Sequence, residues 1–187
     1  MVEDRKEKIL LKAIELYCVE GYANVSITDL QAALNMGRGT LYYYFKDKDE
    51  LFQEVVDMFL IKPKQRALDR VKEGATIPEM IEAMSYYLHQ LREVHEQVDN
   101  KNINTSNVVK VKESATVPEV IEAMMYYLYQ LKEFHEQVDN KNINVSNVVN
   151  VMFTAYSKFP DLYKKARRLY EHELSLWTQA IKNSMRA

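Results

Sequence analysis

Residues that interrupt helices are scarce in this chain. Its 187 residues include only four glycines and four prolines, well below average usage. Turns, bulges and flexible linkers depend on these two residues, so long helices are expected to fill most of the sequence. Apolar residues make up 47% of the chain, enough to bury a sizeable core. The sequence therefore predicts an all-α fold of about nine helices.

Apolar residues that recur with the helical period of 3.6 residues predict helices over residues 8–19, 26–34, 38–44, 49–61 and 161–181. Ser26 and Asp29 have capping-box spacing at the start of the second of these helices. Asn35-Met36-Gly37 predicts a tight turn, because Asn and Gly tolerate left-handed backbone angles. Pro63 is expected to kink or end the fourth helix.

A tandem repeat of 40 residues follows, in which 71–110 can be aligned with 111–150 without a gap. Nine positions differ, which leaves 31 of the 40 identical. Each copy predicts a long helix capped by Thr76 or Thr116, then a polar loop beginning at Asp99 or Asp139. Two copies are too few for a solenoid, so the repeat is interpreted as a duplication within one helical domain.

The segment from Ser26 to Phe45 has the form of a helix-turn-helix, whose second helix enters the major groove of DNA. Leu41 and Phe45 lie four residues apart and should face the core. Arg38 can donate two hydrogen bonds to guanine, and the absence of a side chain at Gly39 lets the backbone approach the duplex. The net charge of −2 restricts DNA contact to such a local patch.

Within this segment a resemblance becomes specific. Gly21-Tyr22, Ser26-Ile27 and the run Gly39 to Leu51, GTLYYYFKDKDEL, resemble the N-terminal domain of the tetracycline-repressor (TetR/AcrR) family, over roughly Lys6 to Phe52. The resemblance implies a repressor that binds a palindromic operator as a homodimer and releases it when a small effector binds. It also implies a helix-turn-helix domain over 1–48, linked by a long helix to a helical ligand-binding and dimerisation domain over 49–187.

The residue types and the resemblance together predict the DNA-binding side chains. They are Ser26, Thr28, Arg38, Gly39, Thr40, Tyr42, Tyr43, Lys46 and Lys48. Hydroxyl groups can reach bases or phosphates, and the two lysines lie at the start of a helix, where free backbone N–H groups also favour phosphate. Tyr44 neighbours Phe45 and can equally belong to the core.

The sequence departs from the family pattern in two places. Gly37 stands where a Ser or Thr usually caps the third helix, which costs up to about 1 kcal/mol. The repeat also occupies the length in which two C-terminal helices usually build the dimer, and the chain is expected to end about where they would begin. The sequence therefore does not identify which helices form the dimer interface.

Aromatic and histidine side chains recur in both copies of the repeat. They are Tyr86, Tyr87 and His95, matched by Tyr126, Tyr127 and His135. They could line a pocket for an apolar or aromatic effector, although core packing explains them at least as well. His89 and His95 are six apart on different helix faces, so no metal site is predicted, and no cofactor is expected.

Other features limit the possible classes of protein. The chain has no phosphate-binding loop, nucleophile elbow or paired catalytic carboxylates, so an enzyme is not expected. The lone Cys18 is expected to be buried, and the N-terminus lacks the apolar run of a signal peptide, which predicts a cytoplasmic protein without a membrane partner. The alternative to a regulator is a helical scaffold protein whose repeat makes the main surface and whose DNA-binding segment is vestigial.

Overall fold

A computed structural model describes residues 2–37, 39–99 and 145–185, and these are helical throughout apart from short connections. The helices are α1 (Val2–Glu20), α2 (Ile27–Ala33), α3 (Thr40–Tyr44), α4 (Lys48–Val56), the π-helical turn η1 (Asp57–Ile61), α5 (Lys62–Leu68), α6 (Ile77–Asp99), α8 (Val145–Lys158) and α9 (Pro160–Ser184). The all-α prediction is confirmed for this part of the chain. Over the same residues, no helix is long and apolar enough to cross a membrane.

The prediction of about nine helices is not matched. Because α4, η1 and α5 follow one another without a break, they form one helix over residues 48–68, called the connecting helix below. Counted in this way, the described residues form seven helices. Pro63 was predicted to end or to kink the helix after residue 61. The prediction of an end was wrong, because the helix continues to residue 68. Lys62 donates instead to the carbonyl of Asp57, and this wider turn lets the helix pass a proline that has no N–H.

Some other helix boundaries follow the predicted signals, whereas α1 begins at Val2 rather than at residue 8 and α3 begins at Thr40 rather than at residue 38. Ser26 caps α2, and its capping box with Asp29 is present. Asn35 has a φ of 50°, as the turn prediction requires, whereas Gly37 does not adopt a positive φ. The helix α6 begins directly after Thr76, whose backbone N–H donates to the Glu79 carboxylate (2.6 Å). Most of the second copy of the repeat lies outside the described residues, so its structure stays a prediction.

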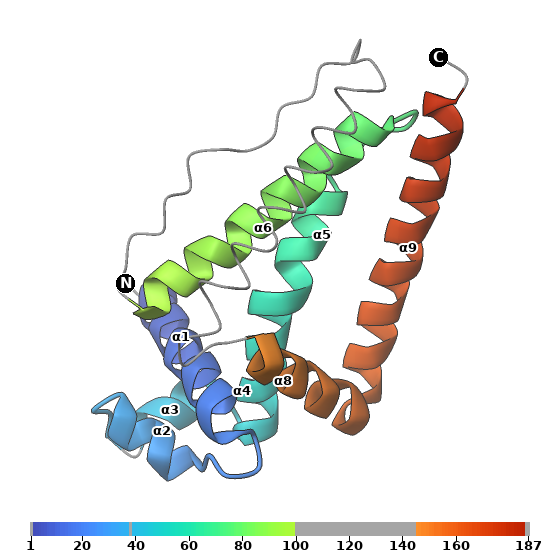
Figure 1. Ribbon diagram of the computed structural model, residues 1–187. Coiled ribbons are helices and arrows are strands. Elements are labelled where there is room, and N and C mark those ends of the chain that lie inside the picture. Colours follow the sequence, from blue (N-terminus) through green and yellow to red (C-terminus); the bar gives the residue numbers. More distant parts are fainter. Residues whose placement is uncertain (1, 38, 100–144, 186–187) are drawn as a thin grey trace.

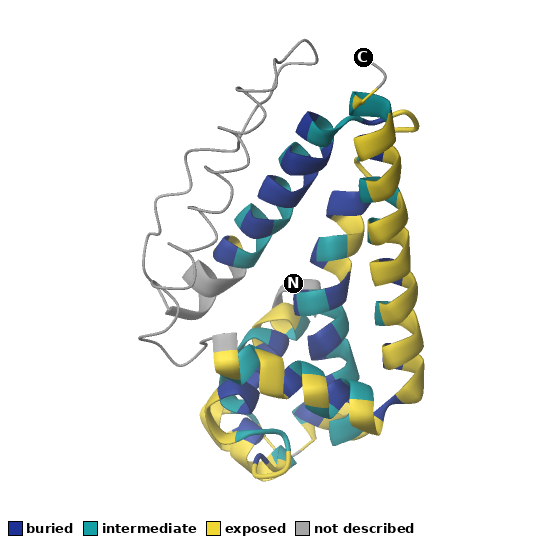
Figure 2. Cartoon of the chain, turned by 45° about the vertical axis from the view of Figure 1, so that its right-hand side comes forward, coloured by how far each residue is buried: buried dark blue, intermediate teal, exposed yellow. Residues whose placement is uncertain are grey.

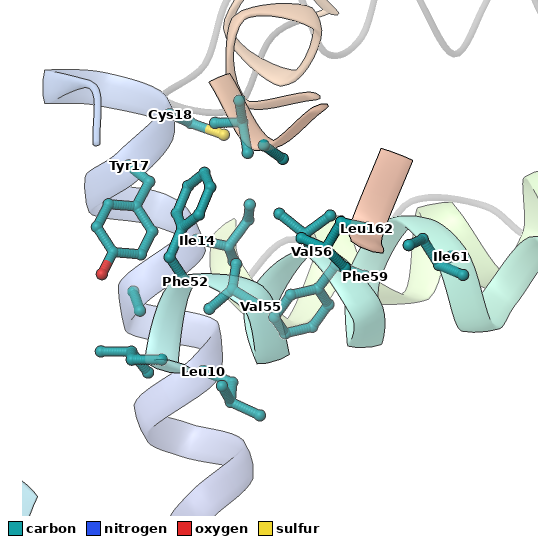
Figure 3. Packing of buried hydrophobic residues seen from close by; sticks show 14 of the residues in the cluster. Leu10, Ile14, Tyr17, Cys18, Phe52, Val55, Val56, Phe59, Ile61 and Leu162 are labelled. Carbon is teal, nitrogen blue, oxygen red and sulfur yellow. The ribbon is translucent and has the colours of Figure 1, made fainter. Parts of the chain in front are cut away.

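One continuous core joins the N-terminal helices to the rest of the molecule. Leu10 and Ile14 of α1 pack near Val55 of the connecting helix, and Leu162 of α9 belongs to the same cluster (Figure 3). Cys18 is buried in this core as predicted, and burial raises the pKa of its thiol to about 12. The domain boundary predicted between residues 48 and 49 stays a prediction.

The C-terminal part of the described chain consists of two helices. α8 and α9 are joined at Phe159, and α9 rises beside the connecting helix (Figure 1). Much of the length of α9 is exposed on its outer side (Figure 2). α8 begins within the second copy of the repeat, at Val145, and α9 follows it. The expectation that the repeat takes the place of the dimer-forming helices stays a prediction.

Candidate nucleic-acid interface

The helix α2 is positioned by its cap and by one buried leucine. The backbone N–H of Ser26 donates to the Asp29 carboxylate (2.7 Å), and the backbone N–H of Asp29 donates back to the Ser26 hydroxyl (3.1 Å). The Ser26 hydroxyl also donates to the Asp29 carboxylate (2.6 Å), and this bond, together with the one from the Ser26 N–H, lowers the pKa of Asp29. Leu30 is fully buried beneath the helix. Ser26 and Thr28 remain exposed at its N-terminal end, where N–H groups can receive a phosphate.

The helix α3 is only five residues long, and its two sides have opposite characters. Leu41 and Phe45 are buried, as predicted, and they hold α3 against the core. Tyr42 and Tyr43 project the other way, with 56% and 75% of their surface exposed. The Tyr44 ring is half-buried and meets the Tyr43 ring edge-on, with centroids 5.0 Å apart. The exposed side of α3 therefore presents the aromatic side chains of Tyr42 and Tyr43.

The connection before α3 contains two glycines, Gly37 and Gly39. Gly39 is the N-cap of α3 and makes no side-chain cap hydrogen bond, so the predicted lack of a cap is present, although at Gly39 rather than at Gly37. A Cβ atom added at Gly39 would meet nothing within 4 Å, and its φ of −86° suits any residue. Folding alone therefore does not require glycine at this position. Arg38 lies outside the described residues.

The two predicted phosphate-binding lysines have different surroundings. Lys46 is exposed, and its backbone N–H donates to the Glu50 carboxylate. Lys48 opens α4 and is half-buried, with its Nζ 4.2 Å from the centre of the Tyr22 ring. Burial, together with the positive charge of Lys158, lowers the pKa of Lys48. The α4 N-terminus also carries its own anion, since Asp47 accepts a hydrogen bond from the Glu50 N–H (2.8 Å).

Sequence reasoning missed one polar cluster beside this surface. Lys158, at the end of α8, donates to the Tyr22 hydroxyl (2.7 Å) and to Asp49 of α4 (3.0 Å). The Tyr22 hydroxyl also donates to the Asp49 carboxylate. No local pattern could have revealed this cluster, because Lys158 lies 136 residues from Tyr22 and 109 from Asp49. The cluster ties the end of α8 to the helix that begins with Lys48.

The cluster makes stability depend on pH in a defined direction. Hydrogen bonds from Tyr22 and Lys158 lower the pKa of Asp49. A carboxylate with a lowered pKa stabilises the folded state above its ordinary pKa, and this contribution is lost as the pH falls below about 4. We expect Asp49→Asn to lower the thermal midpoint at pH 6, and we expect this difference to shrink as the pH falls below about 4. The control is Asp161→Asn, whose ion pair with Lys164 lies within its own helix. A difference at Asp49 that persists unchanged at pH 3 would contradict this assignment.

The predicted effector residues are only partly described. Tyr86 of α6 is half-buried, accepts a hydrogen bond from Gln90 (2.6 Å) and lies under the Arg70 guanidinium, 4.2 Å from the ring centre. Tyr87 is half-buried, with Lys64 Nζ 5.9 Å from its ring centre. Tyr87 thus contacts α5, whereas Tyr86 contacts its own helix and the segment that follows α5. The other predicted effector residues are not among the side chains that the structure describes: His95, Tyr126, Tyr127 and His135.

Comparison with known proteins gives matches that include the same region. A family model described as "Bacterial regulatory proteins, tetR family" matches residues 9–55, which run from α1 into α4. YhgD of Bacillus subtilis, an uncharacterized HTH-type transcriptional regulator, is 29% identical over 93 residues, 50% of this chain and 49% of that protein. The chain is also similar to IcaR of Staphylococcus epidermidis, the negative transcriptional regulator of the biofilm operon icaADBC, with 31% identity over 52 residues (28% of each protein).

A third relative, the HTH-type transcriptional regulator AcrR of Shigella flexneri, is 30% identical over 56 residues, 30% of this chain and 26% of that protein. The chain thus spans about half the length, or less, of these three relatives. The comparisons support the resemblance to the TetR family that the N-terminal motifs indicate.

Proposed function

We propose that this protein is a DNA-binding transcriptional regulator, a repressor that binds a palindromic operator as a homodimer and responds to a small apolar or aromatic effector. The observation that carries the proposal is the two-sided character of α3. Leu41 and Phe45 anchor it, while Tyr42 and Tyr43 stand exposed on a helix too short to form a packing surface of its own. The match of residues 9–55 to a family of bacterial regulators supports the same function.

The proposed contacts divide by chemistry into base-reading and phosphate-binding groups. Bases would be contacted by Arg38, Thr40 and Tyr42, with Gly39 allowing close approach of the backbone. Phosphates would be bound by Ser26, Thr28, Tyr43, Lys46 and Lys48. The open space around the missing Cβ of Gly39 supports its role, since the fold leaves that position free of intramolecular contact.

We propose that the dimer forms through α8 and α9. Exposed apolar side chains line one side of α9 at intervals of seven, four and seven residues, which keeps them on one face of a helix. With two residues of α8 they make up what we call the apolar stripe: Val149, Phe153, Tyr163, Tyr170, Leu174 and Ile181. A second copy of the chain is its proposed occupant, because a palindromic operator requires two copies related by a two-fold axis.

The effector region is proposed to involve α6. Tyr86 and Tyr87 supply half-buried aromatic surface there, and the hydroxyl of the buried, neighbouring Ser85 has no hydrogen-bond partner among the described residues. Mostly apolar surroundings with a few polar groups suit a small hydrophobic molecule. His95, Tyr126, Tyr127 and His135 remain part of this proposal from sequence alone.

Selection of bound DNA from a random library tests the proposed function. The protein is expected to enrich a palindrome, and its affinity for that sequence should fall as salt is raised, because lysines displace counterions from phosphates. We expect Lys46→Ala to reduce the slope of log affinity against log salt by about one. Lys72→Ala is the matched control, since Lys72 is equally exposed but lies between α5 and α6. The proposed function fails if no sequence is enriched or if binding does not depend on salt.

A further inference from the structure

Three ion pairs join the connecting helix to the α8–α9 hairpin. Lys158 contacts Asp49 (3.0 Å) at the start of α4. Further along, Lys165 of α9 contacts Asp57 of η1. Still further, Lys64 of α5 contacts Glu173 of α9 (2.5 Å). Together these six residues are called the charge seam: Asp49, Asp57 and Lys64 on the connecting helix, and Lys158, Lys165 and Glu173 on the hairpin.

The three pairs are regularly spaced. Along the connecting helix the partners are separated by eight and seven residues, and along the hairpin by seven and eight. Within a single helix such intervals correspond to about two turns, so Lys165 and Glu173 lie on one face of α9. Lys158 is the last residue of α8, just before the corner at Phe159. Residue numbers rise together on both sides, which shows that α9 and the connecting helix run in the same direction, as Figure 1 also shows.

The polarity of the charge seam changes at its third pair. In the first two pairs the carboxylates of Asp49 and Asp57 lie on the connecting helix, whereas in the third pair that helix supplies the ammonium of Lys64. If the hairpin were displaced by one pair in one direction, Lys165 would meet Lys64. If it were displaced in the other direction, Glu173 would meet Asp57. Either displacement brings like charges together, so the pattern opposes both neighbouring registers.

Apolar packing alone would oppose these displaced registers less than the charges do. Leucines recur on α9 at intervals of seven, at Leu162, Leu169 and Leu176. The first two are buried, and Leu176 is partly buried against the core. A displacement by seven residues would put one leucine in the place of another and keep a similar apolar contact. The charges therefore supply register information that this leucine repeat lacks.

The third pair is the least exposed of the charge seam. The side chains of Lys64 and Glu173 are 25% and 15% exposed. The ammonium of Lys64 also lies 5.9 Å from the ring centres of Tyr87 and of Tyr170. Because its side chains are less exposed than those of the other two pairs, this pair is screened less by salt. The pair that reverses the polarity thus has the strongest influence on register.

We propose that the charge seam positions α9 on the connecting helix and thereby sets the separation of the two helix-turn-helix segments in the dimer. This inference rests on the proposed function, in which α9 carries the dimer contact. The connecting helix begins beside α3, so the position of α9 along it fixes how far each α3 lies from the two-fold axis. Lys64 and Glu173 are positioning residues in this scheme and need not touch DNA.

Exchange of the third pair separates register control from simple ion pairing. The double variant combines Lys64→Glu with Glu173→Lys and keeps an opposite charge on each side of all three pairs. Every carboxylate of the charge seam then lies on the connecting helix. A displaced register therefore no longer brings like charges together. The matched control exchanges Arg167 and Glu171, an exposed pair within α9 (2.7 Å). Glu173→Gln serves as a second variant that removes only one charge, in case the exchanged protein does not fold.

The first measurement needs no DNA. Spin labels are placed at Ala33→Cys on α2 and Thr178→Cys on α9, both exposed, in a Cys18→Ala background, and labelled chains are diluted with unlabelled ones. The unsubstituted protein and the Arg167/Glu171 exchange should give one narrow distance distribution. The Lys64/Glu173 exchange and Glu173→Gln should broaden it or add a second distance. A narrow, unchanged distribution in both variants would overturn the proposal.

The second measurement uses the DNA sequence selected from the random library, with its half-sites moved apart or together by one base pair. The unsubstituted protein should lose about tenfold in affinity, typical of the cost of one altered position, and the exchanged protein about twofold or less. Equal losses would overturn the link between the charge seam and half-site separation. If the unsubstituted protein selects no DNA, the proposed function fails, while the distance measurement still decides whether the charge seam controls register.

Discussion

Leu174→Glu is expected to convert the proposed dimer into monomers and to lower the affinity for the selected DNA by a factor of about 100 or more. Leu174 lies at the middle of the apolar stripe, with 58% of its surface exposed in the single chain. A two-fold interface contains the residue twice, so each dimer would bury two new carboxylates, and a central apolar contact of this kind costs about 2–4 kcal/mol when lost. A monomer then presents one helix-turn-helix to an operator that needs two.

Sedimentation or light scattering measures the dimer, and titration of the selected DNA measures affinity. Ser175→Glu is the control, because it adds the same charge at an exposed position about 100° further round α9. Neither substitution should disturb the fold of the single chain, since both positions are exposed. Circular dichroism should therefore show the same helix content in both variants as in the unsubstituted protein. A protein that is a monomer before any substitution would contradict the proposed dimer and would favour the alternative of a scaffold protein.

Phe52→Ala is expected to lower the free energy of unfolding by about 3–5 kcal/mol, a large part of the stability of a typical domain. Phe52 is fully buried. Its ring centroid lies 5.1 Å from that of Tyr17, 4.4 Å from that of Tyr22 and 5.8 Å from that of Phe159. Alanine would leave a cavity where α1, α4 and the α8–α9 corner meet.

Urea unfolding followed by circular dichroism gives this free energy. Tyr43→Ala, which removes an exposed aromatic ring from α3, should change it by less than about 0.5 kcal/mol. Phe52→Leu is the milder variant if the alanine protein does not fold. Its loss of unfolding free energy should lie between those of Phe52→Ala and Tyr43→Ala. A loss below about 1 kcal/mol for Phe52→Ala would mean that the aromatic cluster does not join the N-terminal helices to the rest of the chain.

Local signals in the sequence predicted the helix-turn-helix well. The Ser26–Asp29 capping box, the left-handed Asn35 and the burial of Leu41, Phe45 and Cys18 each depend on residues a few positions apart. Such short-range relations are fixed by backbone sterics and helical period, and they survive in the folded protein.

Long-range features could not be predicted in this way. Pro63 was expected to limit the fourth helix, because the rule for proline assumes an α-helix and a π-turn avoids its clash. Contacts of Lys158 with Tyr22 and Asp49 depend on how separate helices pack, which no local pattern contains. The same applies to the charge seam, whose regular spacing becomes visible only when the two helices are side by side. The roles of individual DNA-binding residues stay predictions.

The π-turn over Asp57–Ile61 also has a consequence for how the length of this protein can change during evolution. A π-turn holds one residue more than an α-turn within the same stretch of helix. Deletion of a single residue there would allow an uninterrupted α-helix while the segments on either side keep the faces they already pack. Insertions and deletions of one residue are normally excluded from a buried helix, because they rotate everything that follows by about 100°. In the connecting helix this site can absorb a deletion of one residue, so homologues that are one residue shorter here can keep the same arrangement of helices.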